Sequence, residues 1–188
     1  NLIGYAAVKL LHEAGVPEAV LQFVPGDGAS VGAALTSDAR VAGVAFTGST
    51  ETARAINRAL AAREEAPIAV LIAETGGQNA LIADSSALPE QLVKDAIASA
   101  FTSAGQRCSA ARVLFVQEDI ADKVIAMLAG AMAELKVGDP GLLATDVGPV
   151  IDEDALRMLQ AHAERMDREA RLIAVAPLDP ATAHGTFF

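Results

Sequence analysis

Three features of the sequence predict an α/β fold built around a parallel sheet. Strand-like and helix-like patterns alternate along the 188 residues, which is typical of parallel strands joined by helical crossovers. The run 68–75 (IAVLIAET) reads as a strand buried on both faces, as in the interior of such a sheet. The composition is 52% hydrophobic but only 4% aromatic, which predicts a sizeable aliphatic core.

The first half of the chain alternates helices and strands up to residue 75. Helical patterns cover 4–15, 28–37 and 49–66, and strand patterns cover 19–26, 41–48 and 68–75. Gly15 is expected to end the first helix. Ser49 or Thr50 is expected to cap the third helix, because a side-chain oxygen there can accept from a free backbone N–H.

The second half repeats this pattern after the loop ETGGQ (74–78). Helices are predicted at 88–105, 119–136 and 152–170, and strands at 79–84 and 111–117, with a further strand candidate at 171–176. Pro89 suits the start of its helix, where a missing N–H does no harm. The glycine-rich loop is a natural hinge, so two units are expected, residues 1–75 and 76–188.

Charge and cysteine content exclude several classes of function. The net charge is −10 and there is no basic run, so the chain is a poor nucleic-acid binder. Any bound phosphate must be held mainly by backbone N–H groups and helix ends. A single cysteine rules out an internal disulfide framework, which fits a reducing, cytoplasmic compartment.

No membrane or secretion segment is expected. No apolar run is long enough to span a bilayer, and no signal peptide is visible. The chain opens inside an amphipathic pattern and stops at HGTFF without a terminator. We therefore expect it to be an internal piece of a longer protein.

Two glycine-containing turns are candidate nucleotide-binding loops. In FTGSTE (46–51), a strand leads into Gly48 and a helix start, where pyrophosphates bind in α/β proteins. In PGDGASVG (25–32), the glycines depart by one residue from the G-x-G-x-x-G fingerprint. Taken alone, each stretch is more simply explained as an ordinary turn, because glycine, serine and aspartate are common turn residues.

Glu74 and Cys108 are the candidate catalytic residues. Glu74 lies at the end of a wholly apolar strand, where a carboxylate is a base in a cleft, a cap of the following loop or half of an ion pair with an arginine. Cys108 has small polar neighbours, and the nearby cations Arg107 and Arg112 favour its thiolate form. The other interpretation of Cys108 is a buried structural thiol.

A metal centre and a cysteine–histidine hydrolase pair are not expected. The three histidines are far apart in sequence and none has ligand spacing; they are His12, His162 and His184. None lies near the cysteine motif, as a hydrolase pair in that stretch would require.

Four ordered motifs resemble the aldehyde dehydrogenase superfamily: VPGDGASVG, FTGSTE, AETGGQNA and SAGQRCSA. The later stretch KVGDPGLLATDVGPVID looks like the segment that follows the family's cysteine. Residues 71–93 and 102–140 are similar to the Δ1-pyrroline-5-carboxylate (L-glutamate γ-semialdehyde) dehydrogenase domain of bacterial bifunctional proline utilization A proteins. The resemblance implies a Rossmann-like NAD-binding sheet over 1–75, followed by part of an α/β catalytic domain over 76–188.

The resemblance also implies a mechanism. Cys108 attacks the aldehyde to form a thiohemiacetal, hydride loss to NAD⁺ leaves a thioester, and Glu74 activates the hydrolytic water. Arg107 and Ser109 are candidates to meet a substrate carboxylate, for which a guanidinium or hydroxyl is a suitable partner. The cofactor-contacting residues that it implies are Gly28, Phe46, Thr47, Gly48, Ser49 and Gly76.

Several implied features remain open at this stage. Gln78 replaces a lysine common among relatives, which bears on the subfamily and not on the chemistry. Other family residues that complete the site lie outside these 188 residues, so we expect the chain alone to be inactive. The parent is expected to form a homo-oligomer, and FAD is implied only if a proline dehydrogenase domain is fused to it. The alternatives are a dehydrogenase for another aldehyde and a non-catalytic relative that binds nucleotide or acts as a structural protein. The sequence is compatible with either NAD or NADP.

Overall fold

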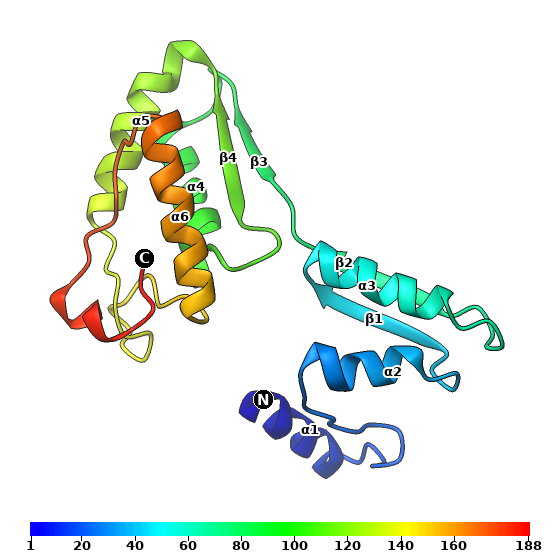
Figure 1. Ribbon diagram of the computed structural model, residues 1–188. Helices are drawn as coiled ribbons and strands as arrows, with labels where there is room; N and C mark the ends of the chain where they lie inside the picture. The colour runs from blue at the N-terminus through cyan, green and yellow to red at the C-terminus, as the bar shows by residue number, and fades with distance from the viewer. The chain divides into compact units, whose positions relative to one another are not determined.

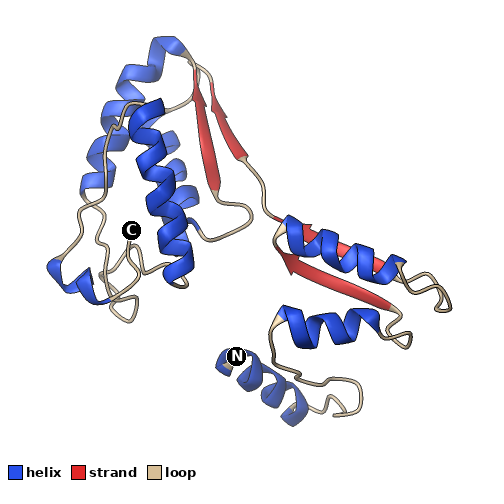
Figure 2. Ribbon diagram, viewed as in Figure 1, coloured by secondary structure: helices blue, strands red, loops and turns tan.

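A computed structural model describes all 188 residues. The chain folds as two compact units, Asn1–Thr75 and Gly76–Phe188, and each is described by itself (Figure 1). Each unit contains helices and one two-stranded parallel sheet (Figure 2). The α/β class and the parallel strand direction predicted from the sequence are therefore confirmed.

The first unit builds its sheet from β1 and β2. Its elements are α1 (Leu2–Glu13), the π-helical turn η1 (Gly28–Gly32), α2 (Ala33–Ser37), β1 (Gly43–Gly48), α3 (Thr50–Ala61) and β2 (Val70–Thr75). The strands pair in register from Gly43 opposite Val70 to Gly48 opposite Thr75. Helix α3 packs on both strands and against α2. The Ser49 hydroxyl accepts from the Thr52 N–H at 3.1 Å, so the predicted cap is confirmed.

The second unit has its core between a sheet and two helices. Its elements are β3 (Asn79–Ala83), α4 (Pro89–Phe101), the 3₁₀ turn η2 (Thr102–Gly105), β4 (Ala111–Val116), α5 (Glu118–Ala133), α6 (Glu153–Glu169) and the 3₁₀ turn η3 (Pro180–His184). Helices α4 and α5 pack together and against β4. The buried core consists of Ala83, Leu92, Val93 and Val124. Pro89 lies in the first turn of α4, as predicted.

Two predicted strands do not form. Residues 19–26 and 171–176 have no ladder partner, and the second stretch is followed only by an isolated bridge between Val137 and Leu178. A strand needs a neighbour as well as an apolar pattern, and no neighbouring backbone pairs with either segment. The predicted helix at 88–105 ends earlier, at Phe101, because Ser103 and Ala104 have left-handed backbone angles.

The prediction that residues 68–75 are buried on both faces is wrong for this chain. Val70 is 63% exposed and Ile72 is 60% exposed. Helix α3 covers one face of the β1–β2 sheet, and these side chains lie on the other. The apolar sequence therefore marks a face that these 188 residues do not themselves cover.

The Arg63 side chain links the carboxyl ends of helices α2 and α3 in the first unit. Its Nη1 donates to the carbonyls of Asp38 and Val41 at 2.7 and 2.9 Å, across the turn from α2 to β1. Its Nε donates to the Leu60 carbonyl near the end of α3. The guanidinium thereby fixes the carboxyl end of α2 relative to the carboxyl end of α3.

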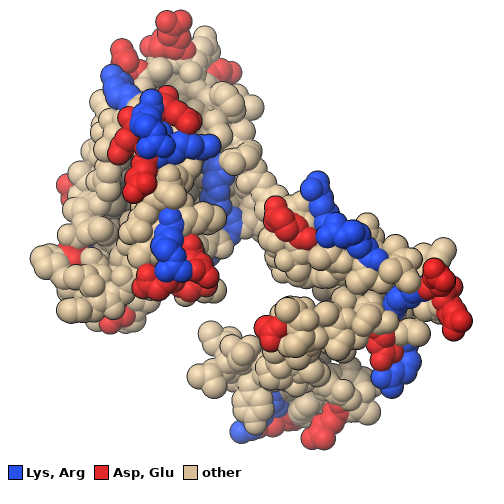
Figure 3. Space-filling view, viewed as in Figure 1, with Lys and Arg blue, Asp and Glu red and all other residues tan.

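The surface is acidic and mixed in charge. On the face drawn in Figure 3, lysine and arginine side chains lie among aspartates and glutamates. None of the helices combines the length and the apolar character needed to cross a bilayer.

Candidate active site

Cys108 lies on a loop of unusual backbone geometry. We call residues 102–110, between α4 and β4, the cysteine loop. Ser103, Ala104 and Gly105 have φ values of 57°, 51° and 66°, so three successive residues are left-handed. This conformation costs about 1–2 kcal/mol for each residue that is not glycine. Such strain persists only where surrounding contacts hold the chain in place.

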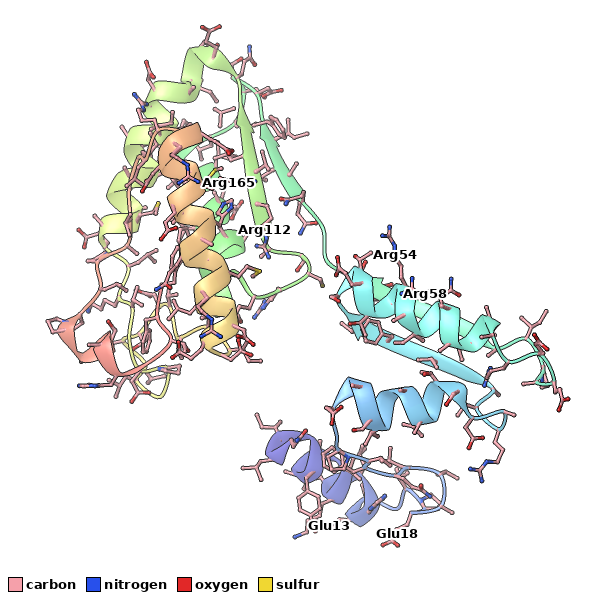
Figure 4. The ribbon with its side chains drawn as sticks, viewed as in Figure 1. Glu13, Glu18, Arg54, Arg58, Arg112 and Arg165 are labelled. Carbon is pink, nitrogen blue, oxygen red and sulfur yellow. The ribbon has the colours of Figure 1, made fainter.

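Those contacts come from side chains that donate to the carbonyls of the cysteine loop. The Asn79 Nδ2, from the first residue of β3, donates to the carbonyls of Cys108 at 2.6 Å and Ala110 at 2.9 Å. Arg112, labelled in Figure 4, donates from its Nη2 to the carbonyls of Gly105 at 2.8 Å and Arg107 at 3.2 Å. Two side chains therefore donate to four carbonyls between residues 105 and 110.

A third side chain links the loop to the segment before α6. The Gln106 Nε2 donates to the carbonyls of Ser103 at 3.0 Å and Pro149 at 3.3 Å. Its Oε1 accepts from the N–H of Ile151 at 2.8 Å. The loop is thus fastened to β3, to β4 and to residues 149–151 of the same unit.

The Cys108 thiol is free and exposed. The structure therefore excludes the interpretation of Cys108 as a buried structural thiol. Arg107 and Ser109, on either side of it, are also exposed, and no ion pair involves Arg107. The Arg112 guanidinium is turned to the loop carbonyls instead. The loop thus exposes three consecutive functional groups: the Arg107 guanidinium, which has no ion-pair partner, the Cys108 thiol and the Ser109 hydroxyl.

In the first unit, a cavity of about 760 Å³ lies between α2, α3 and β1. Cavities of about 300–1,000 Å³ with mainly apolar walls are typical of small-molecule sites. Its lining includes Gly28, Gly32, Phe46 and Thr52, together with small aliphatic residues of both helices. Of the residues implied to contact the cofactor, the cavity therefore contains Gly28 and Phe46.

Thr47, Gly48 and Ser49 connect β1 to α3 beside that cavity. A Cβ at Gly48 would lie 2.5 Å from the Phe46 Cζ, so only glycine lets the ring lie against the backbone here. Ser49 caps α3, whose first N–H groups and positive dipole end favour an anion.

Glu74 lies at the carboxyl end of β2, opposite Thr47 of β1. Its side chain is exposed and belongs to none of the five ion pairs. The alternative of an ion pair with an arginine is therefore wrong for this structure, and the role of Glu74 as a base stays a prediction. Gly76 follows at the start of the second unit, and no atom would lie within 4 Å of a Cβ placed there.

Sequence reasoning missed the supports of the cysteine loop. The sequence pattern placed Asn79 in a strand, and it placed Arg112 in a strand and near the thiol as a cation. Gln106 was only one of the small polar neighbours of Cys108. Their partners are backbone carbonyls, which leave no signature in side-chain spacing. The one available signal is the density of amide and guanidinium side chains around a lone cysteine.

Comparisons with known sequences identify the family. The aldehyde dehydrogenase family model matches residues 1–188. The bifunctional protein PutA of Klebsiella aerogenes is 52% identical over 99% of this chain, which spans 15% of that protein. The 1-pyrroline-5-carboxylate dehydrogenase of Geobacillus kaustophilus is 36% identical over 92% of the chain, which spans 34% of that protein.

Solved structures agree with this assignment. A mutant of Bradyrhizobium japonicum proline utilization A superimposes with a TM-score of 0.92 at 59% identity, covering 98% of this chain and 18% of that one. A Staphylococcus aureus betaine aldehyde dehydrogenase, solved with NAD⁺ and a BME-modified cysteine, superimposes with a TM-score of 0.87 at 29% identity. That match covers 96% of this chain and 36% of the other. The chain therefore belongs to the aldehyde dehydrogenase family.

Proposed function

We propose that this chain is the central part of an NAD⁺-dependent dehydrogenase that oxidises L-glutamate γ-semialdehyde, the open form of Δ1-pyrroline-5-carboxylate, to L-glutamate. The observation that carries the proposal is the exposed Cys108 thiol on a loop whose carbonyls are held by Asn79 and Arg112. The substrate is supported by the similarity to a 1-pyrroline-5-carboxylate dehydrogenase and to PutA proteins.

The first unit, 1–75, is the proposed nucleotide-binding part. The apolar cavity between α2 and α3 fits a flat aromatic base such as adenine. Gly28 and Phe46 line it, and the start of α3, capped by Ser49, fits a pyrophosphate. Thr47, Gly48 and Gly76 complete the proposed contacts. NAD⁺ is further supported by its presence in the related betaine aldehyde dehydrogenase structure.

The second unit, 76–188, carries the proposed nucleophile. The Cys108 sulfur forms a bond to the aldehyde carbon, and the carbonyl oxygen takes a proton to give a thiohemiacetal. Bound NAD⁺ supplies the hydride acceptor for this oxidation. Loss of hydride from carbon and of the hydroxyl proton leaves a thioester on Cys108. Water then adds to the thioester, the C–S bond breaks, and the carboxylate product is released.

Glu74 is the proposed base for that water, and Arg107 with Ser109 the proposed partners of the substrate carboxylate. A carboxylate can act as a general base toward a water that lies within hydrogen-bond reach of it. The Arg107 guanidinium is free of ion pairs, so it is available for a charge-assisted bond to an acidic substrate. We place the intact protein in the cytoplasm as a homo-oligomer, with FAD only where a proline dehydrogenase domain is fused.

The test uses the full-length polypeptide that contains these residues. NADH formation is followed with glutamate semialdehyde and with pentanal, an uncharged aldehyde of similar length. The wild type should prefer the semialdehyde, and Cys108→Ala should lower kcat about a thousandfold or more while NAD⁺ binding is kept. Arg107→Ala should raise KM for the semialdehyde but not for pentanal.

Two results would contradict the proposal. Retained turnover in Cys108→Ala would show that another group is the nucleophile. Equal kcat/KM for the two aldehydes would point to a dehydrogenase of another branch, with a different substrate.

A further inference from the structure

The Asn79 side chain makes the shortest polar contact to the residue that carries the thiol. Its Nδ2 lies 2.6 Å from the carbonyl oxygen of Cys108 and 2.9 Å from that of Ala110. One amide NH₂ has two hydrogens, so both are used by these two acceptors. Asn79 is half-buried, whereas Cys108 is exposed. The contact therefore joins the first residue of β3 to the exposed part of the cysteine loop that carries the thiol.

This contact extends the β3–β4 pairing beyond the sheet. The parallel ladder begins with Asn79 opposite Ala111, and the register then shifts so that Ala80 lies opposite Val113. Regular backbone pairing therefore stops before the cysteine. The Asn79 amide replaces it by holding two carbonyls on the amino-terminal side of β4. Residues 108–110 are thereby aligned with the first residue of β3.

We propose that Asn79 is a positioning residue for the nucleophile. By fixing the carbonyl of Cys108, it sets the orientation of the peptide group that follows the Cys108 Cα, and its bond to the Ala110 carbonyl holds the loop two residues further on. The inference rests on the proposed function, in which Cys108 attacks an aldehyde. A displacement of about 1 Å in a reacting group can cost about a hundredfold in rate, so the loss of this support slows attack without weakening cofactor binding.

The chemistry of the clamp allows an isosteric test. Asn79→Asp keeps the size and shape of the side chain but replaces two N–H donors by a carboxylate oxygen, which repels the carbonyl oxygens. Asn79→Ala removes the donors and the volume. A matched control is Gln117→Ala, because the Gln117 Oε1 accepts from the Ser85 N–H at 2.9 Å and links the same two strands at their opposite ends.

The variants are measured in the full-length polypeptide by kinetics and by amide hydrogen exchange. Both Asn79 variants should lower kcat about 10- to 100-fold with KM for NAD⁺ unchanged within about twofold. Exchange in residues 106–111 should quicken about tenfold or more, while exchange in α4 and α5 stays within about twofold of wild type. Gln117→Ala should leave kcat and the exchange of 106–111 unchanged.

Three results would overturn the inference. The first is unchanged exchange at 106–111 in both variants. The second is a loss of activity accompanied by faster exchange throughout α4 and α5, which would make Asn79 a general stabilising residue. The third is normal kcat in Asn79→Asp, which would leave only a packing role. If the wild type fails to oxidise any aldehyde, the proposed function falls, and the exchange measurement still decides whether Asn79 holds the loop.

Discussion

The side-chain amide of Gln106 and the backbone of Ile151 are hydrogen-bonded across 45 positions of sequence, with an N–H···O distance of 2.8 Å. The same amide donates to Ser103 within the cysteine loop and to Pro149. The segment that precedes α6 is thereby part of the support for Cys108. The position of the Cys108 thiol therefore depends on residues 149–151, which are far in sequence from the motif that contains the cysteine.

Loosening this link should slow turnover. In Gln106→Ala, the Ile151 N–H and the Pro149 carbonyl lose their partner, and the Ser103 carbonyl keeps only the backbone N–H of residue 106. We therefore expect kcat to fall about tenfold and stability to drop by about 1–2 kcal/mol. Gln106→Glu keeps the acceptor for the Ile151 N–H but loses both N–H donors. Its kcat and its stability should therefore lie between those of Gln106→Ala and the wild type. Steady-state kinetics and urea unfolding of the full-length protein measure both effects. Wild-type kcat in Gln106→Ala would show that residues 149–151 do not support the loop.

Glycine substitutions in the second unit should have opposite signs at two positions. Gly105 has a φ of +66°, and an added Cβ would lie 2.7 Å from the Ala100 carbonyl oxygen. Gly105→Ala should therefore destabilise by about 1–3 kcal/mol and displace the cysteine loop. Gly130 lies inside α5 with open space around it. Gly130→Ala should stabilise by about 0.5–1 kcal/mol. Thermal unfolding of the two variants checks the sign, and stabilisation by Gly105→Ala would contradict the strain argument.

Much of the fold could be predicted because it depends on local signals. Alternating apolar runs predict the parallel pairs, Ser49 predicts the start of α3, and Pro89 predicts the start of α4. The strand predictions for 19–26 and 171–176 were wrong, because an apolar pattern does not reveal whether a partner strand is present. Composition alone does not separate them from true strands.

The candidate site divides in the same way. Cys108 could be singled out because a lone cysteine among small polar residues is chemically conspicuous. The supports of its loop could not, because Asn79 and Gln106 bind backbone carbonyls 29 and 43 positions away. The exposure of Val70 and Ile72, in the strand that ends with Glu74 and Thr75, was missed for a related reason: the strand is apolar, but one face of the sheet is uncovered in this chain.

The clamp made by Arg63 should matter for both stability and cofactor binding. Arg63→Met leaves the Val41 carbonyl without its side-chain donor and the Asp38 carbonyl with only the Val41 N–H, so we expect a loss of about 1–3 kcal/mol in stability. The cavity between α2 and α3 should also loosen, which raises the Kd for NAD⁺ several-fold while kcat at saturating NAD⁺ stays unchanged. Arg54→Met, at an exposed position of α3 (Figure 4), is the control and should stay within about 0.5 kcal/mol of wild type. Equal losses of stability and of NAD⁺ affinity in Arg63→Met and Arg54→Met would show that the hydrogen bonds from Arg63 do not hold α2 and α3 together.

The acid sensitivity of nucleotide binding should be traceable to Asp27. The hydroxyl and then the N–H of Ser30 donate to its carboxylate at 2.7 and 2.8 Å, and these bonds hold the pKa of Asp27 below its ordinary value. A carboxyl whose pKa is lowered by folding contributes stability above its unfolded pKa and loses it as the pH falls through the folded pKa. Asp27 caps η1, whose residues Gly28 and Gly32 border the cavity.

Ser30→Ala removes the larger of these two interactions, so the pKa of Asp27 should rise toward its ordinary value in a carboxyl NMR titration. The loss of NAD⁺ affinity on acidification should then begin at a higher pH, nearer the ordinary pKa of an aspartate carboxyl. Ser86→Ala is the matched control, because Ser86 likewise lowers the pKa of Asp84 through its hydroxyl and N–H, but in the second unit. It should raise the pKa of Asp84 and leave the pH dependence of NAD⁺ binding unchanged. An equal shift of that dependence in both variants would mean that general acid destabilisation, and not the cap at Asp27, controls the cavity.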